Sequence, residues 1–313
     1  MYSTFSPTEQ LSKEIAYSCL QVIFAIMVEV TTIYLVDEGG NKEMSVTPVS
    51  FFSGALYERK TCFVYLPPSY EETDQAYPVI YLLHGMYGSE LDWNYKGNAG
   101  QTLDHMISEH RLRECIVVMP SDGGYGHGTY YMDWYDGTGN FEEYLISDLV
   151  PFIDNNYRTL KTRDTRVIAG LSMGGFGAFL LSLRNPDLFG AAASLSGALG
   201  SAQLMPQKDF DRSEFSRIIG PRNGIHAMEH DLNVLTEMRM QDPPEERPSL
   251  YFDCGTEDYL YPMNAAFRNH LQRIGYTHEY QEFSGQHDWN YWTSHLPDTL
   301  MYFERYFSLQ NGK

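Results

Sequence analysis

The chain is poor in cysteine and in basic residues, and both shortages exclude functions. Among its 313 residues there are four cysteines, and no two of them form a Cys-x-x-Cys pair. The absence of such a pair excludes a zinc ribbon and a thioredoxin-type redox motif. Lysine and arginine number 22 against 41 acidic residues, which gives a formal net charge of −19. Because an acidic surface repels phosphate backbones, nucleic acid is not expected as a partner.

The chain also lacks a clear export signal. Residues 16–36 form an apolar run that is long enough to span a bilayer. However, Gln21 and Glu29 interrupt the run, and no positively charged segment precedes it. We interpret it as an additional packed helix or strand, with an export signal or a membrane anchor as the alternatives. A cytoplasmic location without membrane contact is therefore expected, and secretion is the alternative if residues 16–36 act as a signal.

From about residue 45 onward, the sequence alternates between strand-like and helical segments. The continuous apolar run at 79–83 is typical of a strand that is buried on both faces. The segments 115–119 and 166–170 are also predicted to be strands, the first of them buried. Segments with helical periodicity separate these runs. Strands that alternate with helices predict an α/β fold, with a mostly parallel, doubly wound sheet and helices on both faces.

This pattern also predicts the domain organisation. Residues 45–313 are expected to form a single domain, and residues 1–44 an N-terminal extension to which the sequence assigns no role. The region around 200–247 is the longest without a clear strand pattern. We interpret it as a small cap inserted into the domain.

The segment 170–174 reads Gly-Leu-Ser-Met-Gly and matches the Gly-x-Ser-x-Gly pattern of hydrolase nucleophiles. It has the required context, because a predicted strand precedes it and a predicted helix follows. At such a turn the glycines remove side chains that would collide with the neighbouring strand and helix, and the serine oxygen is lifted out of the sheet. Ser172 is therefore predicted to be a nucleophile. The alternative is a glycine-rich helix cap with an incidental serine.

A serine hydroxyl is a weak nucleophile unless a positioned base removes its proton. Two late histidines, His287 and His295, are candidates for this base. His287 is preferred because it is expected on a loop after the last strand, whereas His295 lies inside the following helical stretch. In this fold the residues occur in the order serine, acid, histidine.

Three carboxylates follow or end a predicted strand and could orient the base: Asp253, Glu257 and Asp258. Asp253 is expected within the strand itself. Glu257 and Asp258 are expected on the loop beyond it, where a carboxylate can reach the histidine. Asp258 is the preferred partner, and its alternative role is that of a helix-capping or surface carboxylate.

Acyl transfer also needs two backbone N–H groups that bind the developing oxyanion. The first is predicted to be that of Met173, which follows the nucleophile at the positive end of a helix. The second is expected in the segment 83–88, Leu-His-Gly-Met-Tyr-Gly, directly after a buried strand. There Gly85 allows close backbone approach and Met86 is the predicted donor. We interpret His84 as a structural residue that holds this loop.

A glycine- and aromatic-rich stretch at 121–140 follows the end of a strand, which is where open α/β sheets bind ligands. Its aromatic residues and a tryptophan near the candidate base could stack on a sugar or an aryl ring. The alternative is that these aromatic residues brace the loop. The predicted substrate-binding residues are Tyr130, Tyr131, Trp134 and Trp289.

Together these motifs resemble the putative-esterase (esterase D) family of α/β-hydrolases, and most closely its tributyrin-esterase branch. The resemblance runs from about residue 45 to residue 308, through the segments 64–70, 83–88, 170–175, 254–261 and 285–289. It implies the α/β-hydrolase fold, and a Ser-His-Asp triad without a cofactor or metal. The triad residues that it implies are Ser172, His287 and Asp258, with Met86 and Met173 at the oxyanion hole. One departure is Gln286, which stands where the family usually has glycine.

The resemblance also implies the substrate class, which is a small-molecule ester. Hydrolysis of short-chain acyl esters through an acyl-enzyme is expected from the tributyrin-esterase branch. The same family contains feruloyl and acetylxylan esterases, so action on carbohydrate esters of plant cell walls is the alternative.

Two further classes of function remain as remote alternatives. The segment 226–230, His-Ala-Met-Glu-His, matches the His-x-x-Glu-His pattern of inverted zinc peptidases. On a helix, His226 and His230 would share one face, as zinc binding requires, but no third ligand stands out. The other alternative is a hydrolase fold that serves as a non-catalytic binding module.

Overall fold

The computed structural model describes residues 46–124, 128–201 and 215–310. The N-terminal extension predicted at 1–44 lies outside these residues, as does the apolar run at 16–36. In the described part of the chain, no helix is both long and apolar enough to cross a membrane. The predicted location of the protein therefore stays a prediction.

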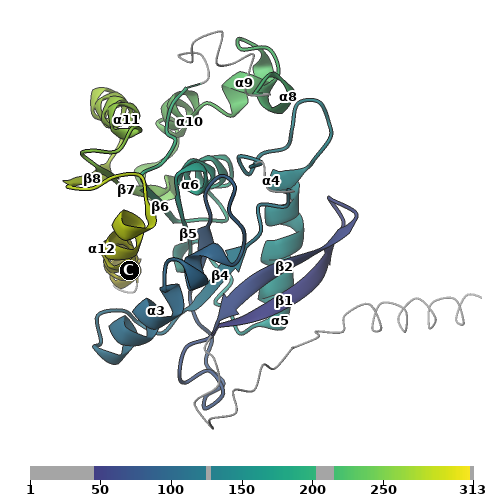
Figure 1. The fold of residues 1–313 in the computed structure, drawn as a ribbon, viewed down its shortest axis with the longest axis vertical. Coiled ribbons are helices and arrows are strands. Elements are labelled where there is room, and N and C mark those ends of the chain that lie inside the picture. The colour runs from purple at the N-terminus through teal and green to yellow at the C-terminus, as the bar shows by residue number, and fades with distance from the viewer. Residues whose placement is uncertain (1–45, 125–127, 202–214, 311–313) are drawn as a thin grey trace, which may run out of the picture.

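The described residues form an eight-stranded sheet in the order β1-β2-β4-β3-β5-β6-β7-β8 (Figure 1). Strands β1 and β2 form an antiparallel pair, and β2 is also antiparallel to β4. The remaining neighbours, from β4 to β8, are all parallel. This confirms the predicted α/β fold with a mostly parallel sheet. The strands are β1 (Val46–Ser53), β2 (Glu58–Tyr65), β3 (Val79–Leu83), β4 (Ile116–Pro120), β5 (Arg166–Leu171), β6 (Ala191–Leu195), β7 (Ser249–Gly255) and β8 (His278–Phe283).

The central strands are buried because helices cover both faces of the sheet (Figure 1). Every residue of β3, β4, β5 and β6 is buried, which explains their continuous apolar runs. Helices α3 and α12 pack on one face, and α5, α6, α10 and α11 pack on the other. The helices around the sheet are α2 (Asp92–Tyr95), α3 (Ala99–Ser108), α4 (Phe141–Glu143), α5 (Val150–Asn156), α6 (Met173–Arg184), α11 (Tyr261–Ile274) and α12 (Trp289–Gln310). Between α4 and α5 the helix continues as a π-helical segment, η1 (Tyr144–Leu149).

In its described residues, the region predicted to be a cap contains three short α-helices, one 3-10 turn (Pro244–Glu246) and no strand. The α-helices are α8 (Phe215–Ile219), α9 (Ile225–Glu229) and α10 (Leu232–Arg239). Helix α10 contacts α6 and α11. The end of α8 is hydrogen-bonded to the loop before α4, because the N–H of Tyr135 donates to the carbonyl of Ile218 at 2.8 Å. This region is therefore fixed to the helices that begin beside the carboxyl ends of the strands.

Candidate active site

Ser172 occupies the sharp turn between β5 and α6. Its φ of 53° and ψ of −116° are unusual for a residue other than glycine, and such strain persists only where the surroundings enforce it. Two backbone hydrogen bonds hold Ser172 in this conformation. The Ser172 N–H donates to the carbonyl of Leu195, and the Ser172 carbonyl accepts from the N–H of Ala198, both at 3.0 Å. The turn thus has the strand–serine–helix geometry that the Gly-x-Ser-x-Gly pattern predicts.

The glycines on either side of this turn allow α6 to approach the sheet. A Cβ atom at Gly174 would lie 2.5 Å from the carbonyl oxygens of both Leu83 and His84. A Cβ atom at Gly170 would lie 2.3 Å from the carbonyl oxygen of Gly174. These contacts are with backbone atoms, which cannot move aside. The close approach of α6 to β3 therefore requires glycine at position 174, and its close approach to β5 requires glycine at position 170.

Ser172, His287 and Asp258 lie in one hydrogen-bonded chain. The Nε2 atom of His287 is 2.9 Å from Ser172 Oγ, and its Nδ1 atom is 2.8 Å from Asp258 Oδ2. The other oxygen of Asp258 accepts the N–H of Leu260 at 2.7 Å. Because Nδ1–H donates to the carboxylate, Nε2 is left to accept the serine proton. Burial acts to raise the pKa of Asp258, but the hydrogen bonds from His287 and Leu260 outweigh it and leave the pKa below its ordinary value.

The competing candidates lie elsewhere. The Asp253 carboxylate accepts a hydrogen bond from the Tyr291 hydroxyl, on the side of the sheet that α12 covers. Glu257 is exposed and accepts the N–H of Gly285. His295 pairs with Asp298 on its own helix at 2.8 Å. Of the candidates, the structure therefore brings only the preferred acid and base to Ser172.

The predicted oxyanion donors lie beside Ser172 and line the same cavity. Their side chains meet at Gly128, where a Cβ atom would lie 2.7 Å from Met173 Sδ and 3.1 Å from Met86 Cγ. The N–H of Met173 is in the first turn of α6, where N–H groups have no partner within the helix. The N–H of Met86 donates to no backbone acceptor among the described residues. Both amides are therefore available to a substrate oxygen.

His84 supports this loop, as the sequence suggested. Its side chain is buried, and its Nε2 accepts the N–H of Asp122 at 3.0 Å. Its Nδ1–H donates to the carbonyl of Gly85 at 2.8 Å. Both nitrogens are thus used within the protein, and His84 has none left for a substrate proton.

A cavity of about 1230 Å³ opens at Ser172. Its wall is mainly apolar and includes side chains of the helices after β6, namely Phe215, Ile219 and Ala227. At the His287 side the wall contains Tyr259 and the tryptophans of α12. The sequence did not single out Tyr259, although its position directly after Asp258 was a usable signal.

Two of the four predicted substrate-binding aromatic residues line this cavity. Tyr130 does so, with its ring 5.9 Å from that of Phe176 and 4.9 Å from that of Phe215. Trp289 also does, with its ring perpendicular to that of Trp93 at 5.5 Å. Their contact with a substrate stays a prediction.

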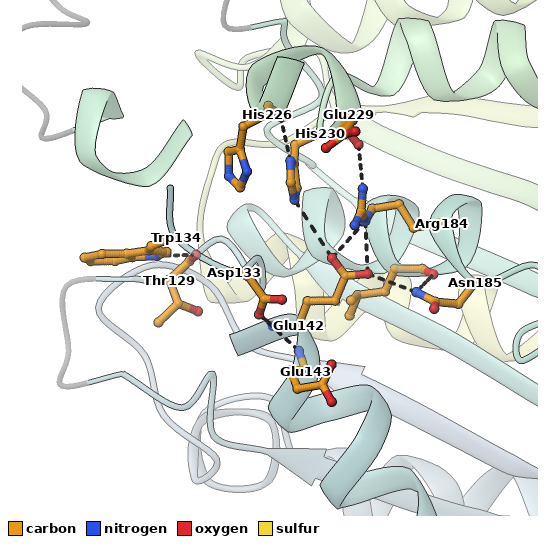
Figure 2. Close-up of polar contacts among 11 residues, drawn as sticks. Thr129, Asp133, Trp134, Glu142, Glu143, Arg184, Asn185, His226, Glu229 and His230 are labelled. Carbon is orange, nitrogen blue, oxygen red and sulfur yellow. Dashed lines mark hydrogen bonds and ion pairs between the residues drawn. The ribbon is translucent and has the colours of Figure 1, made fainter. Parts of the chain in front are cut away.

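Contrary to the prediction, Tyr131 and Trp134 do not line the cavity. Tyr131 is fully buried, and its hydroxyl donates to the carbonyl of His84 at 2.9 Å. The indole N–H of Trp134 donates to the carbonyl of Thr129 at 3.1 Å (Figure 2). The Trp134 ring also packs against Phe141. Both residues therefore brace the loop, which was the alternative reading of these aromatic residues.

The histidine pair of the zinc alternative lies in a polar cluster below α9 (Figure 2). His230 Nδ1–H donates to the carbonyl of His226 at 2.7 Å, and His230 Nε2 lies 3.9 Å from a Glu142 oxygen. Burial lowers the pKa of His230 to about 4, so the imidazole is neutral. The Glu142 carboxylate is bonded by the Arg184 guanidinium at 2.8 Å. No group of three or more metal-ligating side chains exists in the described chain, so the pair has no third ligand.

The fold and this site define an α/β-hydrolase that cleaves carboxylic esters. The chain belongs to the putative esterase family, whose model matches residues 53–303. It is 26% identical over 273 residues to an acetyl esterase of Caldicellulosiruptor saccharolyticus, covering 82% of this chain and 97% of that protein. It is 35% identical over 162 residues to an endo-1,4-beta-xylanase/feruloyl esterase of Xylanibacter ruminicola, covering 49% of this chain and 22% of that larger protein.

Solved structures show the same fold. A ferulic acid esterase superimposes with a TM-score of 0.73 at 27% identity, covering 83% of this chain and 98% of that chain. The fluorophosphonate-binding serine hydrolase F of Staphylococcus aureus gives a TM-score of 0.70 at 23% identity. The match covers 82% of this chain and 97% of the hydrolase F chain. The family resemblance found in the sequence is thus confirmed. Its tributyrin-esterase branch stays a prediction.

Proposed function

We propose that the protein is a serine carboxylesterase that works through Ser172, His287, Asp258 and an acyl-enzyme. One observation carries the proposal. The His287 imidazole lies 2.9 Å from Ser172 Oγ through Nε2 and 2.8 Å from Asp258 Oδ2 through Nδ1. A serine, a base and an orienting carboxylate in this arrangement are what nucleophilic acyl transfer requires.

In the first step, Ser172 Oγ attacks the ester carbonyl carbon while His287 Nε2 takes the serine proton. The carbonyl oxygen becomes an oxyanion, and the amides of Met86 and Met173 donate hydrogen bonds to it. Asp258 keeps the imidazole in the correct tautomer and stabilises its charged form. His287 then gives the proton to the leaving oxygen, the carbon–oxygen bond breaks, and the alcohol departs.

In the second step, water takes the place of the alcohol. His287 removes a proton from the water as it attacks the acyl carbon, and the same amides hold the second oxyanion. The proton passes to Ser172 Oγ when its bond to the acyl group breaks. The carboxylic acid leaves, and the enzyme returns to its first state without a cofactor.

We infer short-chain acyl esters as the first candidate substrates, on the resemblance to tributyrin esterases. The cavity supports a second candidate, because about 1230 Å³ is more space than an acetyl or butyryl group needs. Its aromatic lining, including Tyr130 and Phe176, is suited to an aryl acyl group such as feruloyl. Relatives named acetyl esterase and feruloyl esterase agree with either candidate.

The test is ester hydrolysis by the wild type and the Ser172→Ala variant, with and without EDTA. The substrates are p-nitrophenyl acetate, butyrate and octanoate, and methyl ferulate. We expect hydrolysis that Ser172→Ala lowers by about a thousandfold or more and that EDTA does not change. The surface variant Ser108→Ala is the matched control. Activity that survives in Ser172→Ala but is lost with EDTA would contradict the proposal and favour the His226–His230 pair.

The ranking of the substrates separates the two candidates. A preference for acetate and butyrate over methyl ferulate would support a short-chain esterase. The reverse order would support a feruloyl esterase with the same catalytic residues. Absence of hydrolysis of every ester would contradict both and favour a binding role.

A further inference from the structure

The imidazole of His287 contacts two aromatic rings in addition to its hydrogen-bond partners. The hydrogen bonds of its two nitrogens lie in the plane of the ring and leave the faces of the imidazole uncovered. The ring centroid of Tyr259 lies 4.7 Å from that of the imidazole, with 54° between the planes. The ring centroid of Trp292 lies 4.9 Å away, at 89°. His287 lies on a loop between β8 and α12, outside helix and strand, so side-chain contacts such as these contribute to its position.

The rest of the protein holds the two rings differently. Trp292 belongs to α12, is 7% exposed, and packs edge-on against Trp289 at 5.3 Å. Tyr259 is 73% exposed and lies on the loop between β7 and α11. Its hydroxyl makes no hydrogen bond to the described residues. Trp292 is therefore part of the core, whereas Tyr259 reaches the imidazole from the solvent side and is not held there by its hydroxyl.

The Asp258 backbone and side chain fix the turn that carries Tyr259. One oxygen of the Asp258 carboxylate accepts the N–H of Leu260 at 2.7 Å, and the Asp258 carbonyl accepts the N–H of Tyr261 at 3.0 Å. The other carboxylate oxygen binds His287. One turn therefore presents both the carboxylate and the aromatic ring to the same imidazole, from consecutive residues.

Tyr259 also lines the cavity, as does His287. In the proposed reaction, His287 Nε2 gives its proton to the leaving oxygen, so the alcohol must lie on the His287 side of Ser172. The imidazole becomes a cation during this transfer, and the face of an aromatic ring attracts a cation. The ring of Tyr259 is therefore in contact with His287 at the stage when its position matters most.

We propose that Tyr259 is a positioning residue of this ester hydrolase. Its ring keeps the His287 imidazole in line with Asp258 and Ser172 while the proton moves. The inference rests on the proposed function, because Tyr259 acts through His287. The contact is made by the ring, so the hydroxyl is not required. The exposed side chain contributes little to folding, which allows the role to be tested without unfolding the protein.

The test compares Tyr259→Ala with Tyr259→Phe, using p-nitrophenyl butyrate and a fluorophosphonate probe. We expect Tyr259→Ala to lower kcat by about 10- to 100-fold, because a small displacement of the base costs this much. KM should change far less, and labelling of Ser172 should slow in proportion to kcat. Tyr259→Phe keeps the ring and should retain the wild-type kcat and labelling rate. Tyr57→Ala, which removes a tyrosine that is 87% exposed on the β1–β2 hairpin, is the control.

A magnetic resonance measurement distinguishes a positioning role from a role in lining the cavity, because a residue that only lines the cavity would leave the signal unchanged. The downfield proton of the His287–Asp258 hydrogen bond should be visible in the wild type and in Tyr259→Phe. In Tyr259→Ala it should broaden or disappear. Unchanged kcat and an unchanged proton signal in Tyr259→Ala would overturn the inference. So would an effect on KM alone, or an equal loss of kcat in Tyr259→Phe.

Ser172→Ala, measured in parallel, separates the two ways of failing. If Ser172→Ala keeps its activity, the proposed function is wrong and the role of Tyr259 falls with it. If Ser172→Ala is inactive and Tyr259→Ala is as active as the wild type, only the role of Tyr259 is overturned.

Discussion

Tyr291 on α12 donates a hydrogen bond of 2.8 Å to the Asp253 carboxyl on β7. Asp253 is fully buried, and the hydroxyl of Tyr251 also interacts with its carboxyl. Burial raises the pKa of Asp253 to about 7, although the interactions with the hydroxyls of Tyr291 and Tyr251 oppose this rise. The folded protein therefore keeps this proton at pH values at which the unfolded chain has lost it. The free energy of unfolding should fall as the pH rises from about 4 to about 7.

Asp253→Asn should remove this pH-dependent loss of stability. Asparagine keeps an acceptor for Tyr291 and cannot ionise. The variant should exceed the wild type by about 1 to 3 kcal/mol in the free energy of unfolding at about pH 8, and match it near pH 4. Urea denaturation at both pH values measures the difference, with the exposed Asp74→Asn as the control for net charge. A variant that is less stable than the wild type at about pH 8 would contradict the raised pKa.

The sequence predicts the sheet and the nucleophile turn because local rules decide both. The run at 79–83 is apolar throughout, and 167–170 is apolar after Arg166, since helices cover both faces of these strands. The glycines of the turn are required by backbone contacts that no other residue fits, as at Gly174. Motif order then indicates which acid and base follow.

The walls of the cavity could not be predicted in this way. Tyr130 and Tyr131 are neighbours with nearly equal φ values of 57° and 56°, yet one ring lines the cavity and the other is buried in the core. Which of two adjacent rings faces a cavity depends on tertiary packing, here on the bond from Tyr131 to the carbonyl of His84. The contribution of Phe215 and Ile219 to the wall likewise depends on how the short helices after β6 pack.

Gly174→Ala should disrupt the packing of α6 on β3. The added Cβ atom would lie 2.5 Å from two backbone carbonyl oxygens, so the helix must shift. We expect a loss of roughly 3 kcal/mol in the free energy of unfolding, together with a loss of ester hydrolysis. Thermal denaturation and the p-nitrophenyl assay measure both. Gly54→Ala is the matched control, because its Cβ would meet only an Asp148 oxygen at 3.5 Å. Equal stability of the two variants would contradict the packing account.

Asp258→Asn should impair catalysis with little effect on folding. The amide side chain can donate to His287 Nδ1 and thereby favour the tautomer that cannot accept the serine proton. We expect kcat/KM to fall by about a thousand- to ten-thousandfold. The neighbouring, exposed Glu257→Gln keeps its acceptor for the Gly285 N–H and should retain activity. If Glu257→Gln loses as much activity as Asp258→Asn, the assignment of the acid is wrong.

Arg184→Gln should destabilise the attachment of α9 to the body of the domain. Arg184 bonds Glu142, which is buried, and its Nη1 donates to the carbonyl of Glu229 at 3.0 Å (Figure 2). Removal of the guanidinium leaves the Glu142 carboxylate short of a charged partner. We expect a loss of about 2 to 3 kcal/mol in the free energy of unfolding, measured in urea.

An exposed ion pair provides the control for this prediction. Arg111 and Glu109 are both close to half exposed and 3.4 Å apart, so Arg111→Gln should cost less than about 1 kcal/mol. If both arginine variants lose the same free energy of unfolding, the Arg184–Glu142 pair stabilises the protein no more than an exposed ion pair does.

The most direct test of the account is the site at which a fluorophosphonate probe labels the protein, determined by mass spectrometry of its peptides. The account predicts one adduct, on Ser172, which is absent in Ser172→Ala and forms much more slowly in His287→Ala. Labelling of another serine, or undiminished labelling of the Ser172→Ala variant, would contradict it.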